Sequence, residues 1–330
     1  MDRGGQPLSR QYAERLALVE AYDRSGLFHA YHVAEHHSTP LGMSPSPSVF
    51  LAAVSQRTQR LRFGPMVYTL GLYHPLRLFE EICMLDQMSG GRLELGVGRG
   101  ISPIEVGFYG LDHAAGRDMF EEALAILRQG FESSTIDFAG RFYQLHNVPV
   151  VLNVAQRPHP PLWYGVTRPE STAAVAQQGM NVACNLRPSV VRTVTDCYRA
   201  EWQAAGRDPA AIPSMAMTRH IVVAEDDDEA LALARQAYAQ WHRHFYLLYN
   251  RYGKRSMLDY PESFDELQGR GEAAAGSPAT VRALLEAQIR EAGVNYLMCR
   301  LAFGDLTLEQ SLRSLDLLTR EVLPALAASA

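Results

Sequence analysis

Apolar and polar positions alternate along the chain in a way that predicts a repeating order of helices and strands. Between residues 8 and 25, apolar side chains recur at helical spacing, which predicts an amphipathic helix. Gly26 is typical of a helix end. The apolar stretch 27–34 that follows it predicts a short strand. The residues that define the first helical face are Leu8, Tyr12, Leu16, Val19 and Tyr22.

The same alternation continues to the end of the sequence. Because strands that alternate with helices of this length need crossover connections, the pattern predicts parallel strands joined in βαβ units. Strands are predicted at 61–70, 92–98, 161–166, 181–186, 215–224 and 294–302. Helices are predicted at 48–59, 75–89, 116–131, 169–179, 189–205, 227–249, 278–292 and 307–322.

The predicted fold class is α/β, in the form of a (β/α)8 TIM barrel, which routinely reaches the 330 residues of this chain. The pattern contains seven strands, whereas a closed barrel needs eight. Since the chain opens on a helix, the absent strand would be the first. Either the barrel is completed differently, or the chain starts downstream of that strand. An open doubly wound sheet, which tolerates seven strands, is the alternative.

Two stretches interrupt the alternation. Residues 133–160 are strand-rich, and residues 250–277 are polar and glycine-rich without apolar periodicity. A long structureless segment in a compact domain is usually a lid or a mobile loop, which is the expectation for 250–277. No repeat or domain linker is visible. Residues 1–330 are therefore expected to form a single barrel domain with insertions near 133–160 and 250–277.

Composition and charge exclude several classes of function. The net charge is −5, so the chain lacks the basic footprint of a protein that binds nucleic acid or an anionic membrane surface. Four well-separated cysteines, with no C-x-x-C pair, predict neither a disulfide framework nor a zinc ribbon and favour a reducing cytosol. No apolar run is long enough for a signal peptide or a membrane span. A cytoplasmic location is expected.

The stretch "HVAEHH" (32–37) contains H-x-x-E-H, a pattern of zinc hydrolases. That pattern binds metal on a helix, where positions i and i+4 share a face. Here the segment is a predicted strand, on which His32 and His36 would lie about 13 Å apart, so no metal site is expected. Strand carboxyl ends form the active face of a barrel. Glu35, His36 and His37 are therefore predicted to handle protons, against the alternative of a hydrogen-bonded strand end.

Two further segments contain candidate ligand-binding residues. "LGVGRG" (95–100) lacks the G-x-G-x-x-G order of a dinucleotide fingerprint. The glycines around Arg99, including Gly98, would instead let the backbone approach a flat ligand while Arg99 supplies a cation to a phosphate. "VTRPESTAAVA" (166–176) enters a predicted helix, whose free N–H groups attract anions. An ordinary glycine turn and an ordinary helix cap are the alternatives.

Together these residues make the chain resemble the bacterial luciferase-like flavin monooxygenases. The resemblance runs through "YHVAEHHSTPLG", "LRFGPMVYTLGLYHPLRLFEEICMLDQMSGGRLELGVGRG", "FYGLDHAAGR" and "PLWYGVTRPESTAAVAQQG", and resumes in "GSPATVRALLEAQIREAGVNYLMCRLA". It covers nearly the whole chain with consistent spacing. The combination of EHH, HP-x-R, LDQMSGGR and GRG is specific, although any one of these motifs alone would not be.

The resemblance implies a TIM barrel that binds FMN at its carboxyl-terminal face. The histidine that acts near the flavin falls on His36, and phosphate-binding arginines fall on Arg99 and Arg117. A non-prolyl cis peptide beneath the isoalloxazine falls on Met66-Val67. The luciferase cysteine that precedes the arginine is replaced by Gly98 in this chain. The implied phosphate-binding loop comprises Thr167, Arg168, Ser171 and Thr172.

The resemblance implies a two-component monooxygenase in which O2 adds to reduced FMN at C4a, giving a C4a-peroxyflavin that attacks a small organic substrate. Since the chain has no NAD(P) motif, a separate flavin reductase would supply the reduced FMN. Relatives of this kind commonly form homodimers. One alternative is an F420-dependent oxidoreductase that transfers hydride. Another is a non-catalytic flavin-binding protein.

Overall fold

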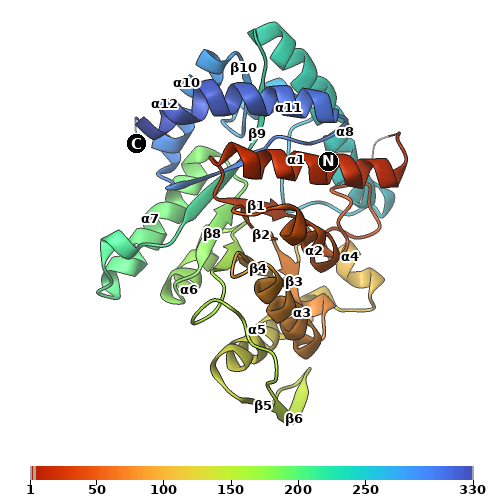
Figure 1. Cartoon of the computed structure of the whole chain (residues 1–330), viewed down its shortest axis with the longest axis vertical. Coiled ribbons are helices and arrows are strands. Elements are labelled where there is room, and N and C mark those ends of the chain that lie inside the picture. Colours follow the sequence, from red (N-terminus) through yellow and green to blue (C-terminus); the bar gives the residue numbers. More distant parts are fainter. Residues whose placement is uncertain (1, 3–4, 329–330) are drawn as a thin grey trace.

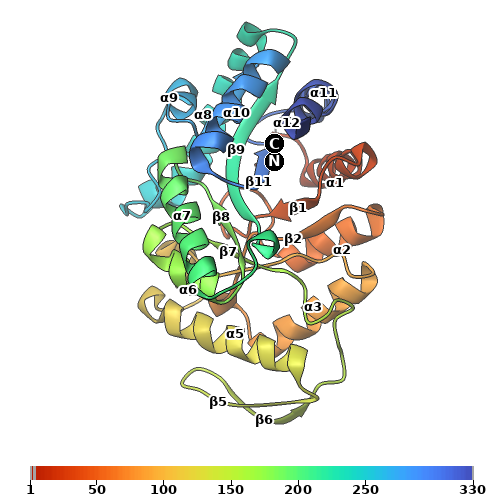
Figure 2. The same cartoon turned by 90° about the vertical axis from the view of Figure 1, so that its left-hand side faces the viewer.

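The computed structural model describes residue 2 and residues 5–328 and has the α/β barrel architecture predicted from the sequence. Parallel strands line the centre and helices surround them (Figures 1 and 2). The strands of the wall are β1 (Ala30–Val33), β2 (Arg62–Pro65), β3 (Tyr68–Thr69), β4 (Leu95–Gly98), β7 (Leu162–Gly165), β8 (Asn181–Cys184), β9 (Met215–Val223) and β11 (Tyr296–Arg300).

These strands follow one another around the wall in chain order. The parallel pairs are β1–β2, β3–β4, β4–β7, β7–β8, β8–β9 and β9–β11. Phe63 of β2 exchanges backbone hydrogen bonds with Arg92 and Glu94, so β2 pairs with the segment that leads directly into β4. A doubly wound sheet would reverse its order at a switch point. The sequential order therefore excludes that alternative.

The wall has an unpaired interval between its first and last strands. Among the described residues, β1 pairs only with β2, and β11 pairs only with β9. The outer helices α1 (Leu8–Ser25) and α11 (Leu308–Leu317) contact each other across this interval (Figure 1). The seven predicted strands of the wall are all present, with β2 and β3 together forming the strand predicted at 61–70.

The expectation that residues 250–277 form a structureless lid is wrong. Helix α8 (Asp227–Arg251) reaches into this stretch and is followed by α9 (Phe264–Gly269) and the strand β10 (Ala273–Gly276). β10 pairs with the last residues of β9. The stretch contains few apolar side chains, but those of Phe264, Leu267 and residues 273–275 are buried. Alanine is a weak strand former, so β10 had no sequence signal.

β10 does not fill the interval between β1 and β11. Alternate residues of a strand direct their backbone groups to opposite sides. The carbonyl of Ser214, directly before β9, accepts a hydrogen bond from the N–H of Val182 in β8. The carbonyl of Met215, the first residue of β9, accepts one from Asn295, which leads into β11. Ala224 lies an even number of residues after Ser214, so its backbone groups face the same side of the strand, and its N–H donates to Gly276 of β10. β10 therefore extends the wall on the β8 side of β9.

The helices begin and end at residues suited to those positions. Five α-helices of the described residues carry proline in the first turn, where its missing N–H costs nothing: α2 (Pro47–Arg57), α3 (Pro75–Met88), α4 (Pro103–Phe108), α7 (Pro188–Ala204) and α10 (Pro278–Ala292). α1 and α10 end at Gly26 and Gly293, with φ of 68° and 64°, a conformation that glycine adopts without strain. Further helices are α5 (Gly116–Glu132), α6 (Thr172–Gln177) and α12 (Leu323–Ala328).

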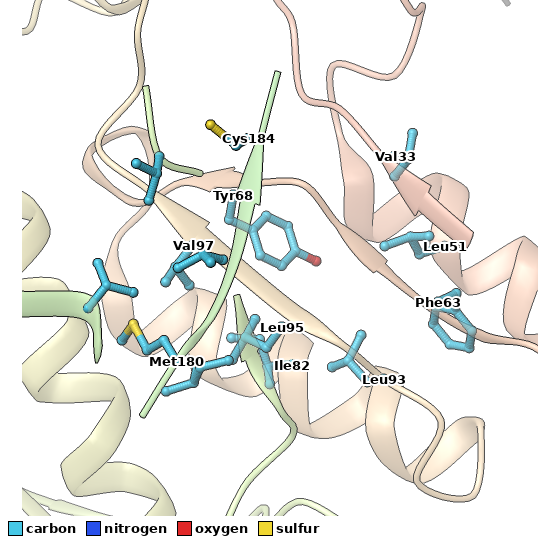
Figure 3. Close-up of a cluster of buried hydrophobic side chains, with 14 of the residues drawn as sticks. Val33, Leu51, Phe63, Tyr68, Ile82, Leu93, Leu95, Val97, Met180 and Cys184 are labelled. Carbon is cyan, nitrogen blue, oxygen red and sulfur yellow. The ribbon is translucent and has the colours of Figure 1, made fainter. Parts of the chain in front are cut away.

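The hydrophobic core lies between the wall and the surrounding helices (Figure 3). Leu51 of α2 faces Val33 and Phe63, while Ile82 of α3 lies against the strand that contains Leu95. All five side chains are buried, and burying an apolar side chain of this size stabilises the fold by about 1.5–3 kcal/mol. This packing fixes β1, β2 and β4, whose carboxyl ends bear the candidate site.

Residues 133–160 contain an antiparallel hairpin of β5 (Thr135–Ala139) and β6 (Gln144–Pro149). The hairpin lies at one end of the molecule, beyond α5 (Figure 1). It contributes no residue to the cavity described below.

Candidate functional site

The carboxyl ends of the barrel strands surround a cavity of about 640 Å³. Much of the cavity lining comes from segments that each follow a different strand, and helix α1 contributes Leu18, Val19 and Tyr22. These segments are Glu35–His37 after β1, Met66–Val67 between β2 and β3, Gly98–Ser102 after β4, Thr167 after β7, Asn185 after β8, and Arg300 at the end of β11. Parallel strands bring their carboxyl ends to one edge, which is why residues far apart in sequence meet there.

His36 is held by a carboxylate from a distant part of the chain. Its Nδ1 lies 3.4 Å from Oε1 of Glu105, and its side chain is 24% exposed. Burial on its own would lower the pKa of His36, but the hydrogen bond and the negative charge of Glu105 outweigh it and raise the pKa. The pKa of Glu105 is lowered because the contacts with His36 outweigh its burial. Nε2 of His36 is left as the ring atom that can exchange a proton with a ligand.

His37 connects a buried carboxylate to a tyrosine. Its Nε2 lies 2.7 Å from Oε1 of Glu35, and its Nδ1 lies 2.7 Å from the Tyr109 hydroxyl. An ionised carboxylate can only accept, so in the neutral ring Nε2–H donates to Glu35 and Nδ1 accepts from Tyr109. The other Glu35 oxygen accepts from the backbone of Thr69, at 2.9 Å. The backbone N–H of His37 donates to Glu105, at 2.7 Å, which ties both histidines to one carboxylate.

His32 lies deeper in the cavity and is separated from this cluster. Neither ring nitrogen has a hydrogen-bond partner among the described residues, and burial lowers the pKa of His32 to about 4. Its ring packs edge-on against Trp163, with centroids 5.2 Å apart. No three His, Cys, Asp or Glu side chains of the described residues gather in an arrangement that would hold a metal ion.

One wall of the cavity is a flat stretch of backbone. The Met66–Val67 peptide is cis, and both residues line the cavity. Gly98 packs so closely beneath it that an added Cβ would lie 2.5 Å from Cγ2 of Val67, well inside the distance at which atoms repel. A glycine at position 98 therefore brings two strands together and leaves a shelf that a planar ring system can cover.

Arg99 and Thr167 lie at the edge of this shelf, on the same cavity. Arg99 forms no ion pair with any described residue, so its guanidinium is available to an anion. Together with the Thr167 hydroxyl it provides donors suited to a phosphate. The shelf, the cation and the hydroxyl fit a flavin mononucleotide, which combines a flat ring with a phosphate at the end of a chain.

The other predicted cofactor residues do not line the cavity. The Arg117 side chain is 74% exposed and pairs with Glu121 at 2.9 Å. Arg168 is exposed, and its carbonyl accepts a hydrogen bond from the Ser171 hydroxyl at 2.8 Å. Thr172 is fully buried, and its hydroxyl has no partner in the described structure. The structure thus gathers Glu35, His36, His37, Met66, Val67, Gly98, Arg99 and Thr167 but leaves Arg117, Arg168, Ser171 and Thr172 outside the cavity lining.

Several site residues had no clear sequence signal. Glu105 was missed, although the Ser102-x-x-Glu105 spacing predicts a helix start, and Ser102 does cap α4 by accepting from the Glu105 N–H. That spacing says nothing of where the Glu105 carboxylate points. Tyr109 follows α4, and Arg300 ends β11. Both belong to elements whose position relative to His36 only the fold reveals.

Comparison with known proteins identifies relatives over almost the whole chain. The family model described as luciferase-like monooxygenase matches residues 1–296. An uncharacterised protein, y4wF of Sinorhizobium fredii, is 45% identical over 94% of this chain and 91% of its own length. The oxygenase component of a flavin-dependent trigonelline monooxygenase from Acinetobacter baylyi is 25% identical over 70% of this chain and 64% of its own length.

Solved structures have the same fold. Monooxygenase RslO1 of Streptomyces bottropensis superposes with a TM-score of 0.88 at 27% identity, covering 97% of this chain and 95% of its own. The oxygenating constituent of 3,6-diketocamphane monooxygenase from Pseudomonas putida, in complex with FMN, has a TM-score of 0.77 at 20% identity, covering 98% and 95%. An F420-dependent secondary alcohol dehydrogenase has a TM-score of 0.72 at 19% identity, covering 96% and 95%. The fold therefore accommodates either cofactor. No helix among the described residues is long and apolar enough to cross a membrane.

Proposed function

Because the chain belongs to the luciferase-like monooxygenase family, we propose that it is a flavin-dependent monooxygenase that uses reduced FMN and O2 on a small organic substrate. The single observation that carries the proposal is that one cavity joins the shelf of Met66, Val67 and Gly98 to the proton-handling group of His36 and Glu105. Reduced FMN, when bound, would supply the electrons that activate O2.

The residues proposed to hold the cofactor are those at the shelf. Met66 and Val67 would support the ring system, Gly98 would keep the shelf flat, and Arg99 with Thr167 would bind the phosphate. The chain has no dinucleotide fingerprint. A separate reductase is therefore proposed to deliver reduced FMN, as the name "oxygenase component" of the trigonelline enzyme implies for that protein.

His36 is proposed to move the proton. Glu105 favours the protonated ring, so Nε2–H can donate to an oxygen that gains negative charge during the reaction. Glu105 also receives the His37 N–H, which fixes the position of the carboxylate. Glu35, His37 and Tyr109 form a connected set beside it that would orient this edge of the site. Leu258 and Tyr260 also line the cavity and are proposed to shield the reaction from water.

The test supplies reduced FMN and 18O2 to the purified chain with a panel of cyclic ketones, carboxylic acids and alkenes, and measures 18O in the products. Incorporation of one labelled oxygen that is lost in His36→Ala supports the proposal. Parallel titration with FMN and F420 separates the alternatives. Hydride transfer from reduced F420 without O2 would contradict an oxygenase. Tight FMN binding with no labelled product from any panel member would support a non-catalytic flavin protein instead.

A further inference from the structure

Arg300 places a positive charge in the cavity and forms no ion pair with a carboxylate of the described residues. It is the last residue of β11, and its half-buried side chain lines the cavity. Its Nη1 lies 2.9 Å from Nε2 of His220. This is the side-chain hydrogen bond that Arg300 forms with the described residues, and Arg300 forms no ion pair with any of them. A guanidinium has five N–H donors, so most of its donor capacity remains available to a ligand.

His220 is built to accept from Arg300 and to hold it in place. Burial, followed by the charges of Arg300 and Arg219, keeps the pKa of His220 well below its ordinary value, so the ring is neutral. Since an arginine can only donate, Nε2 of this neutral ring must accept. The ring is fixed edge-on between Trp241 and Phe303, with centroids 4.6 and 4.7 Å away. The guanidinium also lies over the Trp241 ring, 5.3 Å from its centroid.

The carboxylates that share the cavity are already engaged elsewhere. Glu35 is bound by His37 and Thr69, and Glu105 by the ring of His36 and the backbone of His37. Asp2 accepts from the backbone N–H groups of Gly42 and Gly304, at 3.0 and 2.9 Å. Each is therefore held by other groups, and none of them forms an ion pair with Arg300. A cation left without a counter-ion in a partly buried site is costly unless a ligand supplies the opposite charge.

The surface next to Arg300 is apolar and aromatic. The cavity wall there is formed by Trp241, Phe245, Leu258, Tyr260 and Phe303, of which Trp241, Tyr260 and Phe303 are buried. Trp241 and Tyr260 pack edge-on with centroids 4.9 Å apart, as do Phe245 and Tyr260. Such a wall suits the hydrocarbon body of a ligand and offers it few polar partners. The ligand that matches both features has a charged end and an apolar body.

We propose that Arg300 is a specificity-determining residue that binds the carboxylate of an organic-acid substrate. The carboxylate would pair with the guanidinium that His220 orients, and the apolar body would lie along Trp241 and Tyr260 with its oxidisable carbon toward His36. This inference rests on the proposed oxygenase function for the identity of the ligand as a substrate. The binding site itself stands on the geometry of Arg300, His220 and the aromatic wall.

The test uses binding rather than turnover. Cyclohexanecarboxylate and its neutral amide, which share one shape, are titrated into the purified chain while tryptophan fluorescence is followed. Trp241 lies beside Arg300 and should report occupancy, and the loss of signal in Trp241→Phe identifies it among the three tryptophans. We expect the wild type to bind the carboxylate at least about tenfold more tightly than the amide, as a charge-assisted pair implies.

In Arg300→Gln this preference should disappear while amide binding is unchanged, and Arg300→Lys should keep part of it. Equal binding of the two probes by the wild type would overturn the proposal without reference to any variant. The proposal also fails if Arg99→Gln, rather than Arg300→Gln, removes the preference. A preference that depends on Arg300, with no 18O incorporated into any acid or neutral compound of the panel, would count against the oxygenase function and leave the carboxylate site standing. Incorporation into neutral substrates, with no preference for the carboxylate in the wild type, would overturn the carboxylate site and leave the oxygenase function standing.

Discussion

His36 Nδ1 and Glu105 Oε1 lie 3.4 Å apart, although 69 residues separate them in the chain. The contact joins the end of β1 to the first turn of α4, so two βα loops whose strands are separated in the wall by β2 and β3 meet at this hydrogen bond. Because the negative charge of Glu105 outweighs the burial of His36, the contact raises the pKa of the histidine. The protonation state of His36 is thus set by a residue outside the EHH motif.

Glu105→Gln should lower the pKa of His36. With the charge removed, burial dominates and disfavours the protonated ring, so the pKa of His36 should fall. Protonated His36 would then persist only to a lower pH. The pKa is measured by NMR titration of the His36 ring protons. Glu121→Gln is the matched control, since Glu121 pairs with Arg117 on the surface. A pKa of His36 that is the same in Glu105→Gln and the wild type would contradict the coupling.

Arg99→Gln should weaken FMN binding about tenfold to a hundredfold, because loss of a hydrogen bond to a charged phosphate costs about 1.5–3 kcal/mol. Arg117→Gln should change it little, since that side chain is 74% exposed and paired with Glu121. Both dissociation constants are measured by flavin fluorescence quenching. The reverse ranking would favour Arg117, the second arginine that the family resemblance implies, as the phosphate-binding residue.

The comparison of Arg99 with Arg117 shows how far the sequence could predict the site. Apolar runs bounded by polar turns located all seven strands of the wall, including the half-buried β1 and β11. The carboxyl-end rule then placed Glu35, His36, His37 and Arg99 on one face, where the structure finds them. Arg117 was implied by the family resemblance, and its side chain is 74% exposed and paired with Glu121.

Two features could not be predicted from the sequence. One is a strand whose residues have weak strand propensity, and the other is contact between segments that are distant in the chain. β10 consists of three alanines and a glycine, which lack the branched or aromatic side chains that mark a strand. Its burial against α8 and α9 supplies the stability that its own residues do not. Glu105 and Arg300 are ordinary charged residues in the sequence, and only the folded barrel brings them to the same cavity as His36.

Gly98→Ala should impair both folding stability and flavin binding. The added methyl carbon would lie 2.5 Å from Cγ2 of Val67, so the Met66–Val67 shelf must shift, at a cost of about 1–3 kcal/mol. Stability is measured by urea unfolding, and binding by FMN titration. Gly107→Ala is the control, since an added Cβ there meets nothing within 4 Å. If the two variants bind FMN alike, the shelf does not depend on Gly98.

His32 should make the fold sensitive to acid. Burial lowers its folded-state pKa to about 4, whereas the unfolded chain titrates near its ordinary value of about 6.5. Above pH 6.5 the residue is neutral in both states and contributes no pH dependence. Between about 6.5 and 4 only the unfolded chain takes up the proton, so the free energy of unfolding should fall by about 1.4 kcal/mol per pH unit.

His32→Gln removes this proton uptake but leaves every other titrating group in place. Urea unfolding of the variant and the wild type at pH 7.5 and pH 4.5 isolates the contribution as a double difference. At the lower pH the wild type should lose on the order of 2 kcal/mol more than the variant. Because the two nitrogens of His32 have no hydrogen-bond partner among the described residues, glutamine at this position does not break a hydrogen bond of the neutral ring. An equal loss of stability in both proteins would mean that His32 stays neutral in the unfolded chain as well, or that it takes up its proton in the folded protein. Either result would contradict its assignment as a buried neutral group.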